Sequence, residues 1–398
     1  MNPQSIHSIL ANQHLDTDRG TWERRLSEVT SRDVEAALAW RPGSYSQAKL
    51  LALVSPAAEE YLERMAVLAQ QLTIQRFGRA MRLYAPVYLS SYCVNRCRYC
   101  GFNWDNTFTR ARLTVDEAVA QAQVLASEGY RDILLVSSED KAFIDVPYLA
   151  ELAKRLKAGR RFEVGDAGPA ARGPMPDAFS FIGIEIYQMS AAEYEQLFAA
   201  GIDGVTLYQE TYDREVYARY HPGGPKADYD TRLCAPDDMG QANMREIGLG
   251  VLLGLADWRI ETLALAEHAW HLMRRHWQSR VSFSFPRLRS ACGVSSSEFP
   301  HLLADKNLVQ MMLALRLCFS DSGIVLSTRE PAYLRDRLMG LVVTRISAGS
   351  RTSPGGYTDP DTNTGQFDVV DSRSPGEVVA VIRDKGFDPV WKDWDRSF

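Results

Sequence analysis

From about residue 81 onward, short apolar runs alternate along the chain with longer segments that repeat apolar residues at helical spacing. Eight apolar runs are predicted as strands, at 83–90, 131–140, 181–188, 204–212, 246–255, 280–288, 323–330 and, with the weakest pattern, 342–350. The predicted helices between them are 114–130, 146–159, 190–201, 258–275, 307–321 and 331–342. Apolar strands separated by helices indicate a parallel sheet covered by helices, and eight of them predict an α/β fold of the (β/α)8 TIM-barrel type. An open, doubly wound sheet is the alternative.

Two segments flank the predicted barrel. The first 80 residues have apolar residues at helical spacing over 22–40 and 55–78, and Ser55-Pro56 is a helix-start signal. The last segment is rich in Gly, Pro and Asp, with one short predicted helix at 375–386. Its aromatic residues predict an ordered tail packed on the barrel, namely Phe367, Phe387, Trp391 and Trp394. We therefore expect an N-terminal helical extension at 1–80, a barrel at 81–350 and a C-terminal tail at 351–398.

Composition limits the classes of partner. A net charge of −5 argues against nucleic acid or an anionic membrane as a partner held by broad positive charge. The first 20 residues lack the basic start and apolar run of a signal peptide, and the most apolar stretch, 247–258, is too short to cross a bilayer. We expect a cytoplasmic protein.

Barrel enzymes carry their chemistry at the C-terminal ends of the strands. The first such position holds "SSYCVNRCRYCGF", in which Cys93, Cys97 and Cys100 have the spacing C-x3-C-x2-C. Three thiolates can bind three irons of a [4Fe–4S] cluster and leave the fourth iron open to a chelating cofactor. A zinc site completed by a distant histidine and a coincidental spacing are the alternatives. Of the other cysteines, Cys318 is predicted in the core, and Cys234 and Cys292 in polar loops.

The cysteine spacing resembles the signature of the radical S-adenosylmethionine superfamily. Further segments resemble the tyrosine lyases of thiazole biosynthesis, the 2-iminoacetate synthase family, from about residue 20 to the C-terminus. They include "SPAAEEYLERMAVLAQQLT", "YQETYDREVYARYHPGGPK", "IGLGVLLGLADWR", "WQSRVSFSFPRLR", "LSTRE" and "PVWKDWD".

This resemblance implies a reaction. Members of the family cleave S-adenosylmethionine reductively to a 5′-deoxyadenosyl radical, which abstracts hydrogen from L-tyrosine. Cleavage of the Cα–Cβ bond then yields 2-iminoacetate (dehydroglycine) and p-cresol. The implied cofactors are a [4Fe–4S] cluster and S-adenosylmethionine. The implied partners are a thiazole synthase, which uses 2-iminoacetate to make the thiazole of thiamine, and a flavodoxin- or ferredoxin-type electron donor.

Three other assignments compete with the tyrosine lyase. A related radical lyase acts on L-tryptophan, as 3-methyl-2-indolic acid synthase does, and the sequence alone does not separate the two substrates. A hydrogenase-maturation relative has a second cysteine-ligated cluster in a C-terminal extension, whereas residues 319–398 contain no cysteine. A non-catalytic iron–sulfur electron carrier would need all four irons bound by protein.

Residues that would hold S-adenosylmethionine follow from the resemblance. Tyr99 resembles the aromatic residue that flanks the adenine. The superfamily's Gly-Gly-Glu stretch is "VSSED" here, so that Ser137 and Ser138 replace the glycines and Glu139 matches the acid that holds the methionine amino group. Arg232 matches an arginine that pairs with the methionine carboxylate. We expect Gln209 and Glu210, at the end of the fourth strand, to contact ribose or substrate; structural roles are the alternative for each of these residues.

An amino-acid substrate needs a cation for its carboxylate. Arg329, at the end of the seventh strand, is the predicted residue, Arg287 and Arg289 are competitors, and one of the three is expected to be structural. Tyr88, on the first strand, resembles an active-site tyrosine of the related aromatic amino-acid lyases. The alternative is that Tyr88 packs the barrel interior.

Overall fold

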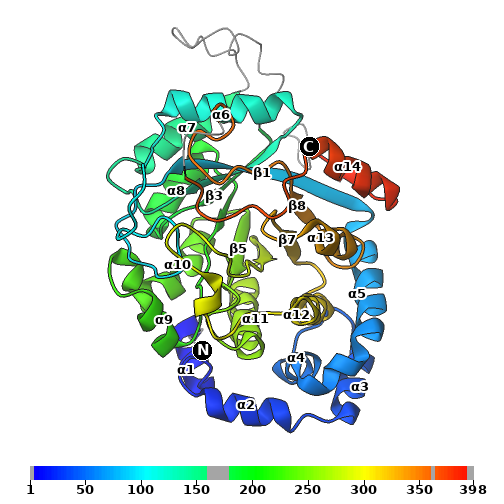
Figure 1. The fold of residues 1–398 in the computed structure, drawn as a ribbon. Coiled ribbons are helices and arrows are strands. Elements are labelled where there is room, and N and C mark those ends of the chain that lie inside the picture. The colour runs from blue at the N-terminus through cyan, green and yellow to red at the C-terminus, as the bar shows by residue number, and fades with distance from the viewer. Residues whose placement is uncertain (1–3, 159–178, 360–363, 392–398) are drawn as a thin grey trace.

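A closed parallel barrel forms the centre of the protein in this computed structural model, which describes residues 4–158, 179–359 and 364–391. The strand order is β2-β3-β4-β5-β6-β7-β8-β1, and pairing of β1 with β2 closes the ring (Figure 1). The strands are β1 Ala80–Ser90, β2 Asp132–Ser137, β3 Phe181–Glu185, β4 Gly204–Thr206, β5 Glu246–Gly250, β6 Arg280–Ser284, β7 Gly323–Leu326 and β8 Arg345–Ser347. The predicted barrel is therefore confirmed, and the open sheet is wrong.

Helices surround the barrel in the predicted alternation, with two additions. The helices are α6 Val115–Ser127, α7 Val146–Ala158, α8 Ala191–Ala200, α9 Arg214–Tyr220, α10 Tyr229–Gln241, α11 Trp258–Arg275, α12 Asp305–Cys318 and α13 Ala332–Met339. The sequence pattern missed α9 and α10. Pro236 lies inside α10 and removes one backbone hydrogen bond, but Asp228 caps the helix by accepting from the Thr231 N–H at 3.0 Å. Cys234 is thus on a helix and not in a loop, Cys292 is in a turn, and Cys318 is buried as predicted.

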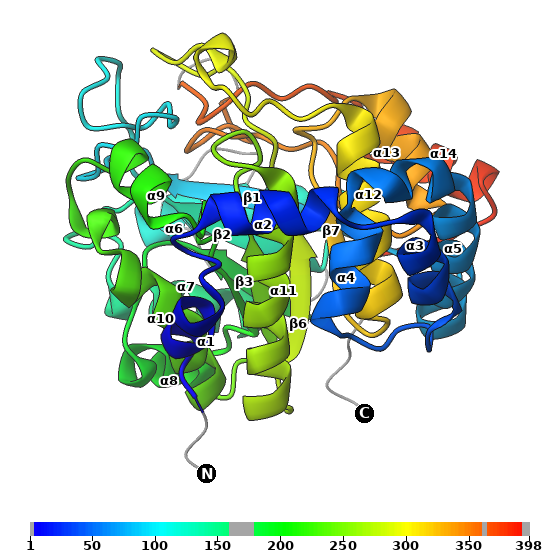
Figure 2. The same cartoon turned by 90° about the horizontal axis from the view of Figure 1, so that it is seen from below.

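The N-terminal extension is a set of short helices packed on one side of the barrel. It contains α1 Ile6–Gln13, α2 Arg19–Ser27, α3 Ser31–Ala39, α4 Gln47–Val54 and α5 Leu62–Phe77. The helical pattern over 22–40 is divided because Thr30 starts α3 with a capping box, its N–H donating to Asp33 at 2.8 Å. Helices α4 and α5 pack against α12, while α1, α2 and α4 contact α11 (Figure 2).

The C-terminal tail packs on the barrel, as predicted, and returns to the first strand. Helix α14 (Pro375–Asp384) leads into β9 (Asp388–Val390), which pairs in parallel with β1 at Ala80–Arg82. Phe387 is buried, and the Trp391 ring lies edge-on to Tyr130 at 4.9 Å; Trp394 lies outside the described residues. The division of the chain into three domains stays a prediction.

Opposite ends of the barrel differ in chemistry. At the N-terminal end, buried charges compensate one another: Arg82 donates to Asp132 at 2.9 Å, and Arg345 pairs with Asp132 and, at 3.3 Å, with Glu246. At the C-terminal end, the strands surround two cavities. No helix within the described ranges is long and apolar enough to cross a membrane.

Candidate active site

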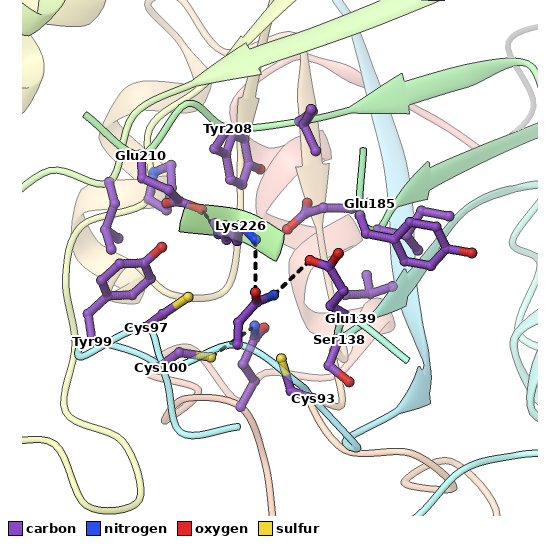
Figure 3. Close-up of a pocket in the computed structure, with 18 of the residues that line it drawn as sticks. Cys93, Cys97, Tyr99, Cys100, Ser138, Glu139, Glu185, Tyr208, Glu210 and Lys226 are labelled. Atoms are coloured by element: carbon purple, nitrogen blue, oxygen red, sulfur yellow. Dashed lines mark hydrogen bonds and ion pairs between the residues drawn. The ribbon is translucent and has the colours of Figure 1, made fainter. Parts of the chain in front are cut away.

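The three clustered cysteines line a cavity of about 1000 Å³ at the C-terminal ends of the strands (Figure 3). Arg110 holds their loop in shape by donating to the backbone carbonyls of Ser91 at 2.6 Å, Phe102 at 2.9 Å and Asn103 at 2.6 Å. A turn brings the Cys100 N–H to the Cys97 carbonyl at 3.2 Å. Burial raises the pKa of the Cys97 thiol to about 12, and the neighbouring thiols contribute to that rise.

A second loop rests directly on the cysteine loop. Gly224 has a φ of +91°, and a Cβ there would lie 2.4 Å from Asn95 Oδ1 and 2.8 Å from the Val94 carbonyl. Only glycine allows this approach. Asn95 then joins both sides of the cavity, because its Oδ1 accepts from the Lys226 N–H at 2.9 Å while its Nδ2 donates to Glu139 at 2.7 Å (Figure 3).

The serines that replace the expected glycines are tied to backbone. Ser137 Oγ donates to the Ser138 carbonyl at 2.9 Å, and Ser138 Oγ donates to the carbonyls of Tyr92 and, at 3.1 Å, Ser90. Ser137, Ser138 and Glu139 all line the cavity. The substitutions therefore keep the acid at the cavity wall, so Glu139 is not a solvated loop residue.

Glu210, in the segment that follows β4, has an unusual backbone conformation. Its φ is +69°, a region that non-glycine residues seldom adopt. The Lys226 ammonium lies 2.5 Å from its carboxylate and the Arg232 guanidinium 3.7 Å from it. Burial alone would raise the pKa of Glu210, but these two cations lower it below its ordinary value. Glu210 is therefore held ionised in the cavity.

Glu261 on α11 fixes the residues that follow Glu210 through two hydrogen bonds. Its carboxylate accepts from the Thr211 hydroxyl at 2.7 Å and from the Tyr212 N–H at 2.9 Å. Glu261 is buried, and that burial raises its pKa to about 7. Two hydrogen bonds from one helix thus fix the residues that follow Glu210.

Arg232 lines the upper cavity, whereas Gln209 does not line either cavity. Arg232 lines the cavity, and its Nε donates to the Tyr208 carbonyl at 2.7 Å. It is buried and is not an arginine on the outer face of a helix. Gln209 does not line either cavity, and neither atom of its buried side-chain amide has a hydrogen-bond partner in the described part of the chain.

Tyr99 forms part of the cavity wall together with a neutral histidine. The His221 Nδ1 lies 2.8 Å from the Tyr217 carbonyl, which can only accept, so the proton is on Nδ1. His221 Nε2 therefore accepts from the Tyr99 hydroxyl at 2.8 Å. Burial, with a smaller contribution from Lys226, lowers the pKa of His221 to about 3. This pair fixes the ring of Tyr99 against the cavity.

A second cavity of about 510 Å³ lies deeper in the barrel and shares part of its wall with the first. Both cavities are lined by Val136, Glu185, Tyr208, Pro286, Arg329 and Phe367. Tyr88 lines the deeper one, and its hydroxyl donates to Gln366 at 2.8 Å. The same tail residue lies with its amide nitrogen 3.8 Å from the Cys100 sulfur. Through Gln366, the C-terminal tail therefore contacts both the loop that carries the three cysteines and the lining of the deeper cavity.

The three candidate arginines occupy different environments. The Arg287 guanidinium pairs with Glu330 through Nε, at 2.9 Å, and with Asp305 at 2.7 Å, and it lines neither cavity. Arg289 lines the upper cavity but also donates to Glu330, at 3.0 Å. Arg329 lines both cavities, and no carboxylate among the described residues lies within 4.0 Å of its guanidinium.

Comparison with known proteins agrees with this geometry. Residues 87–266 match the Radical SAM superfamily model, and residues 284–388 match the Biotin and Thiamin Synthesis associated domain. Two curated proteins called 2-iminoacetate synthase, from Escherichia coli strain K12 and Salmonella typhimurium strain LT2, are each 39% identical over 93% of this chain and 93% of their own. The chain belongs to the 2-iminoacetate synthase family.

A solved structure related to this family adds the fold. The crystal structure of HydG, a maturase of the [FeFe]-hydrogenase, has a TM-score of 0.85 and 29% identity to the present chain, covering 95% of this chain and 81% of its own. Membership of a radical SAM family makes the chain an enzyme with a [4Fe–4S] cluster and S-adenosylmethionine as cofactors.

The residues present fit these cofactors of the family. Of the described residues that line the upper cavity, three are cysteines and none is a histidine, so the set offers three thiolates to a cluster. In the described ranges, no group of three or more His, Cys, Asp or Glu side chains is arranged to hold a single metal ion.

Sequence reasoning missed several residues of the site. Glu185 stands inside the predicted third strand, where one charge in an apolar run was the available signal. Lys226 ends the segment "YQETYDREVYARYHPGGPK", which resembles the family as a whole but does not mark this lysine as a site residue. Asn95 lies between the cysteines, and its role depends on contacts from two other loops. Gln366 and Phe367 come from the tail, and no local pattern marks them.

Proposed function

We propose that this chain is a radical tyrosine lyase, which cleaves the Cα–Cβ bond of L-tyrosine to give 2-iminoacetate and p-cresol for thiazole biosynthesis. The observation that carries the proposal is that the two cavities adjoin and share part of their walls. One is lined by three cysteines, and the other presents Arg329, which has no carboxylate within 4.0 Å among the described residues. The relatives called 2-iminoacetate synthase support the identity of the product.

The upper cavity would hold the cofactors. Cys93, Cys97 and Cys100 would bind the cluster, and Glu139 and Arg232 would hold the amino and carboxylate groups of S-adenosylmethionine. When bound, the cluster and S-adenosylmethionine together supply a 5′-deoxyadenosyl radical. The chain contributes position: Tyr99, fixed by His221, would flank the adenine, and Ser137 and Glu210 line the same cavity.

The deeper cavity would hold the substrate. The planar guanidinium of Arg329 offers two parallel N–H donors to a carboxylate. Tyr88 and Tyr208 offer ring surfaces and hydroxyls beside it. The tail residue Phe367 lies over Arg329, with the guanidinium carbon 3.5 Å from the ring centroid. At this place its ring would help to exclude water from a radical.

The partners follow from the chemistry of the product. An imine hydrolyses in water, so 2-iminoacetate is expected to pass to a thiazole synthase that uses it directly. Reductive cleavage of S-adenosylmethionine requires electrons, for which a flavodoxin- or ferredoxin-type protein is the proposed donor.

An anaerobic assay tests the proposal. The reconstituted protein with S-adenosylmethionine, dithionite and L-tyrosine should form 5′-deoxyadenosine and p-cresol together. Formation of 5′-deoxyadenosine without p-cresol would retain a radical enzyme and contradict tyrosine as the substrate, and L-tryptophan would then be assayed. Absence of both products from a protein with an intact cluster would contradict the proposal as a whole.

A further inference from the structure

Three carboxylates line the upper cavity, and one of them lacks the partners that the other two have. Glu139 accepts from Asn95 at 2.7 Å, and Glu210 pairs with Lys226 at 2.5 Å. Glu185, the last residue of β3, has no Lys or Arg nitrogen within 4.0 Å of its carboxylate in the described part of the chain, and the nearby Tyr208 hydroxyl donates to Ser284 at 3.1 Å. Among the described residues, an amide holds Glu139 and a cation holds Glu210, whereas Glu185 has neither, so its carboxylate is available to a cationic ligand.

Glu185 also has a specific place between cofactor and substrate. It lines both cavities, as Arg329 does. Strand β3 pairs with β2 so that Glu185 lies beside Val136, one residue before Ser137 at the cofactor wall. Figure 3 shows its side chain pointing into the cavity near Glu139. The two groups that an α-amino acid requires, a cation and an acid, thus face the same space from β3 and from the end of β7.

Burial and the surrounding charges bring the pKa of Glu185 close to neutral pH. Burial and the negative charge of Glu210 raise the pKa of Glu185 to about 7, against a smaller lowering by Arg329 and Lys226. The titratable and charged groups that face it come from four elements of the barrel, namely Tyr84, Tyr88, Tyr208, Glu210, Lys226 and Arg329. A carboxylate with this environment can both accept and release a proton at the working pH.

The proposed reaction requires a base at the amino group. The ammonium of a free amino acid has three N–H bonds, whereas the nitrogen of 2-iminoacetate has one. Of the two hydrogens lost, one leaves as the hydrogen atom that the radical removes, and the other must leave as a proton. Removal of a hydrogen atom from an ammonium would leave an electron-poor aminium radical cation, whereas removal from a neutral amine leaves a neutral aminyl radical, so the proton is expected to leave first. The C=N bond then forms from the unpaired electron on nitrogen and one electron of the Cα–Cβ bond.

We propose that Glu185 binds the substrate ammonium opposite Arg329 and removes one proton from it. The inference rests on the proposed tyrosine lyase function. The N–H bond breaks, its electron pair stays on nitrogen as the lone pair of a neutral amine, and the proton is transferred to a Glu185 carboxylate oxygen. No electron is exchanged with Glu185, and the carboxylic acid returns its proton to solvent when the products leave. Glu185 is thus a catalytic base of the chain's own.

Glu185→Gln tests this assignment because it keeps the shape and removes the capacity to take a proton. We expect the iron content to stay within about threefold of wild type, and p-cresol formation at pH 7 to fall by about 100-fold or more, a usual effect of losing a general base. In wild type, p-cresol formation should decline as the pH falls below about 7, because the base becomes protonated. Glu185→Gln should lack that acid limb, and Glu185→Asp should recover part of the rate and retain a limb.

The controls separate the possible failures. Wild type that makes no p-cresol would contradict the proposed function itself. Wild type that makes p-cresol, beside a Glu185→Gln variant with an equal rate and the same pH profile, would contradict only the role of Glu185. Loss of iron or of 5′-deoxyadenosine formation in both Glu185 variants would show a structural role and would overturn the assignment as well.

Discussion

The guanidinium carbon of Arg329 lies 3.5 Å from the centroid of the Phe367 ring, although the two residues belong to the end of β7 and to the C-terminal tail. Arg329 thereby keeps its charge in the wall of both cavities with an aromatic face in place of a carboxylate. A cation held in this way has free N–H donors for a substrate, whereas a salt bridge would occupy them.

The first prediction concerns this contact. Phe367→Leu should raise the KM for tyrosine by roughly 2- to 30-fold, because a cation–π contact contributes about 0.5–2 kcal/mol and the ring also limits the positions of Arg329. Initial rates of p-cresol formation against tyrosine concentration would measure the change. Phe367→Tyr keeps the aromatic face and should stay close to wild type; an equal rise in KM in that variant would contradict the explanation.

Replacement of Arg287 should mainly lower the stability of the protein, whereas replacement of Arg329 should mainly lower its activity on tyrosine. Arg287→Met leaves the buried Glu330 without its main partner and should lower the free energy of unfolding by about 3 kcal/mol or more. Arg329→Met should change stability by less than about 1 kcal/mol but lower kcat/KM for tyrosine by roughly 10- to 150-fold, as loss of a charged hydrogen bond does. Anaerobic urea denaturation and the p-cresol assay would measure stability and activity in both variants. A large loss of stability in Arg329→Met, with little loss in Arg287→Met, would contradict the assignment.

The cluster should depend on three cysteines and not on the others. Alanine at Cys93, Cys97 or Cys100 should abolish the brown colour and low-temperature EPR signal of the reconstituted protein, since a [4Fe–4S] cluster with two protein ligands is poorly held. Cys292→Ser, in a turn of the loop that packs on Asn106, is the matched control and should retain iron. Loss of iron in that control would mean that Cys292 also contributes a ligand.

Gly224 should be required for the cysteine loop to form. Gly224→Ala would place a Cβ 2.4 Å from Asn95 Oδ1 and force a left-handed φ on alanine, so we expect a loss of roughly 1–3 kcal/mol and reduced iron content after reconstitution. Gly340→Ala is the comparison, because nothing lies within 4 Å of a Cβ there and its φ is −83°. Thermal unfolding and iron analysis of the two variants should differ clearly; similar behaviour would refute the steric argument.

Stability should depend on pH through Glu261. Its pKa is about 7 in the folded protein, above the ordinary value of 4.5, so the folded state binds this proton more tightly than the unfolded state. The stability due to the protonated form is complete below about pH 4.5 and is lost as the pH rises to about 7. The free energy of unfolding of wild type minus that of Glu261→Gln should therefore decrease by up to about 3 kcal/mol between these pH values. A difference independent of pH would mean that the carboxyl group does not titrate in this range.

The sequence predicted those parts of the protein that local pattern determines. Apolar runs located all eight barrel strands, and the C-x3-C-x2-C spacing located the cluster loop at the end of the first strand. Pattern could not separate Arg287 from Arg329, because both follow an apolar strand; the difference is that Glu330 folds back toward Arg287. The parts that pattern missed depend on distant partners, as Gln366 does when it meets Tyr88 and Cys100.

Pairing of β9 with β1 also sets the order of events during synthesis. Ala80 pairs with Asp388, so the strand that leads into the cysteine loop gains this neighbour only after some 300 further residues have been made. At about 5–20 residues per second, that interval lasts on the order of 15–60 s. The barrel cannot close before β8 has emerged either. During that time the three thiols belong to a sheet that still lacks two of the neighbours of its first strand.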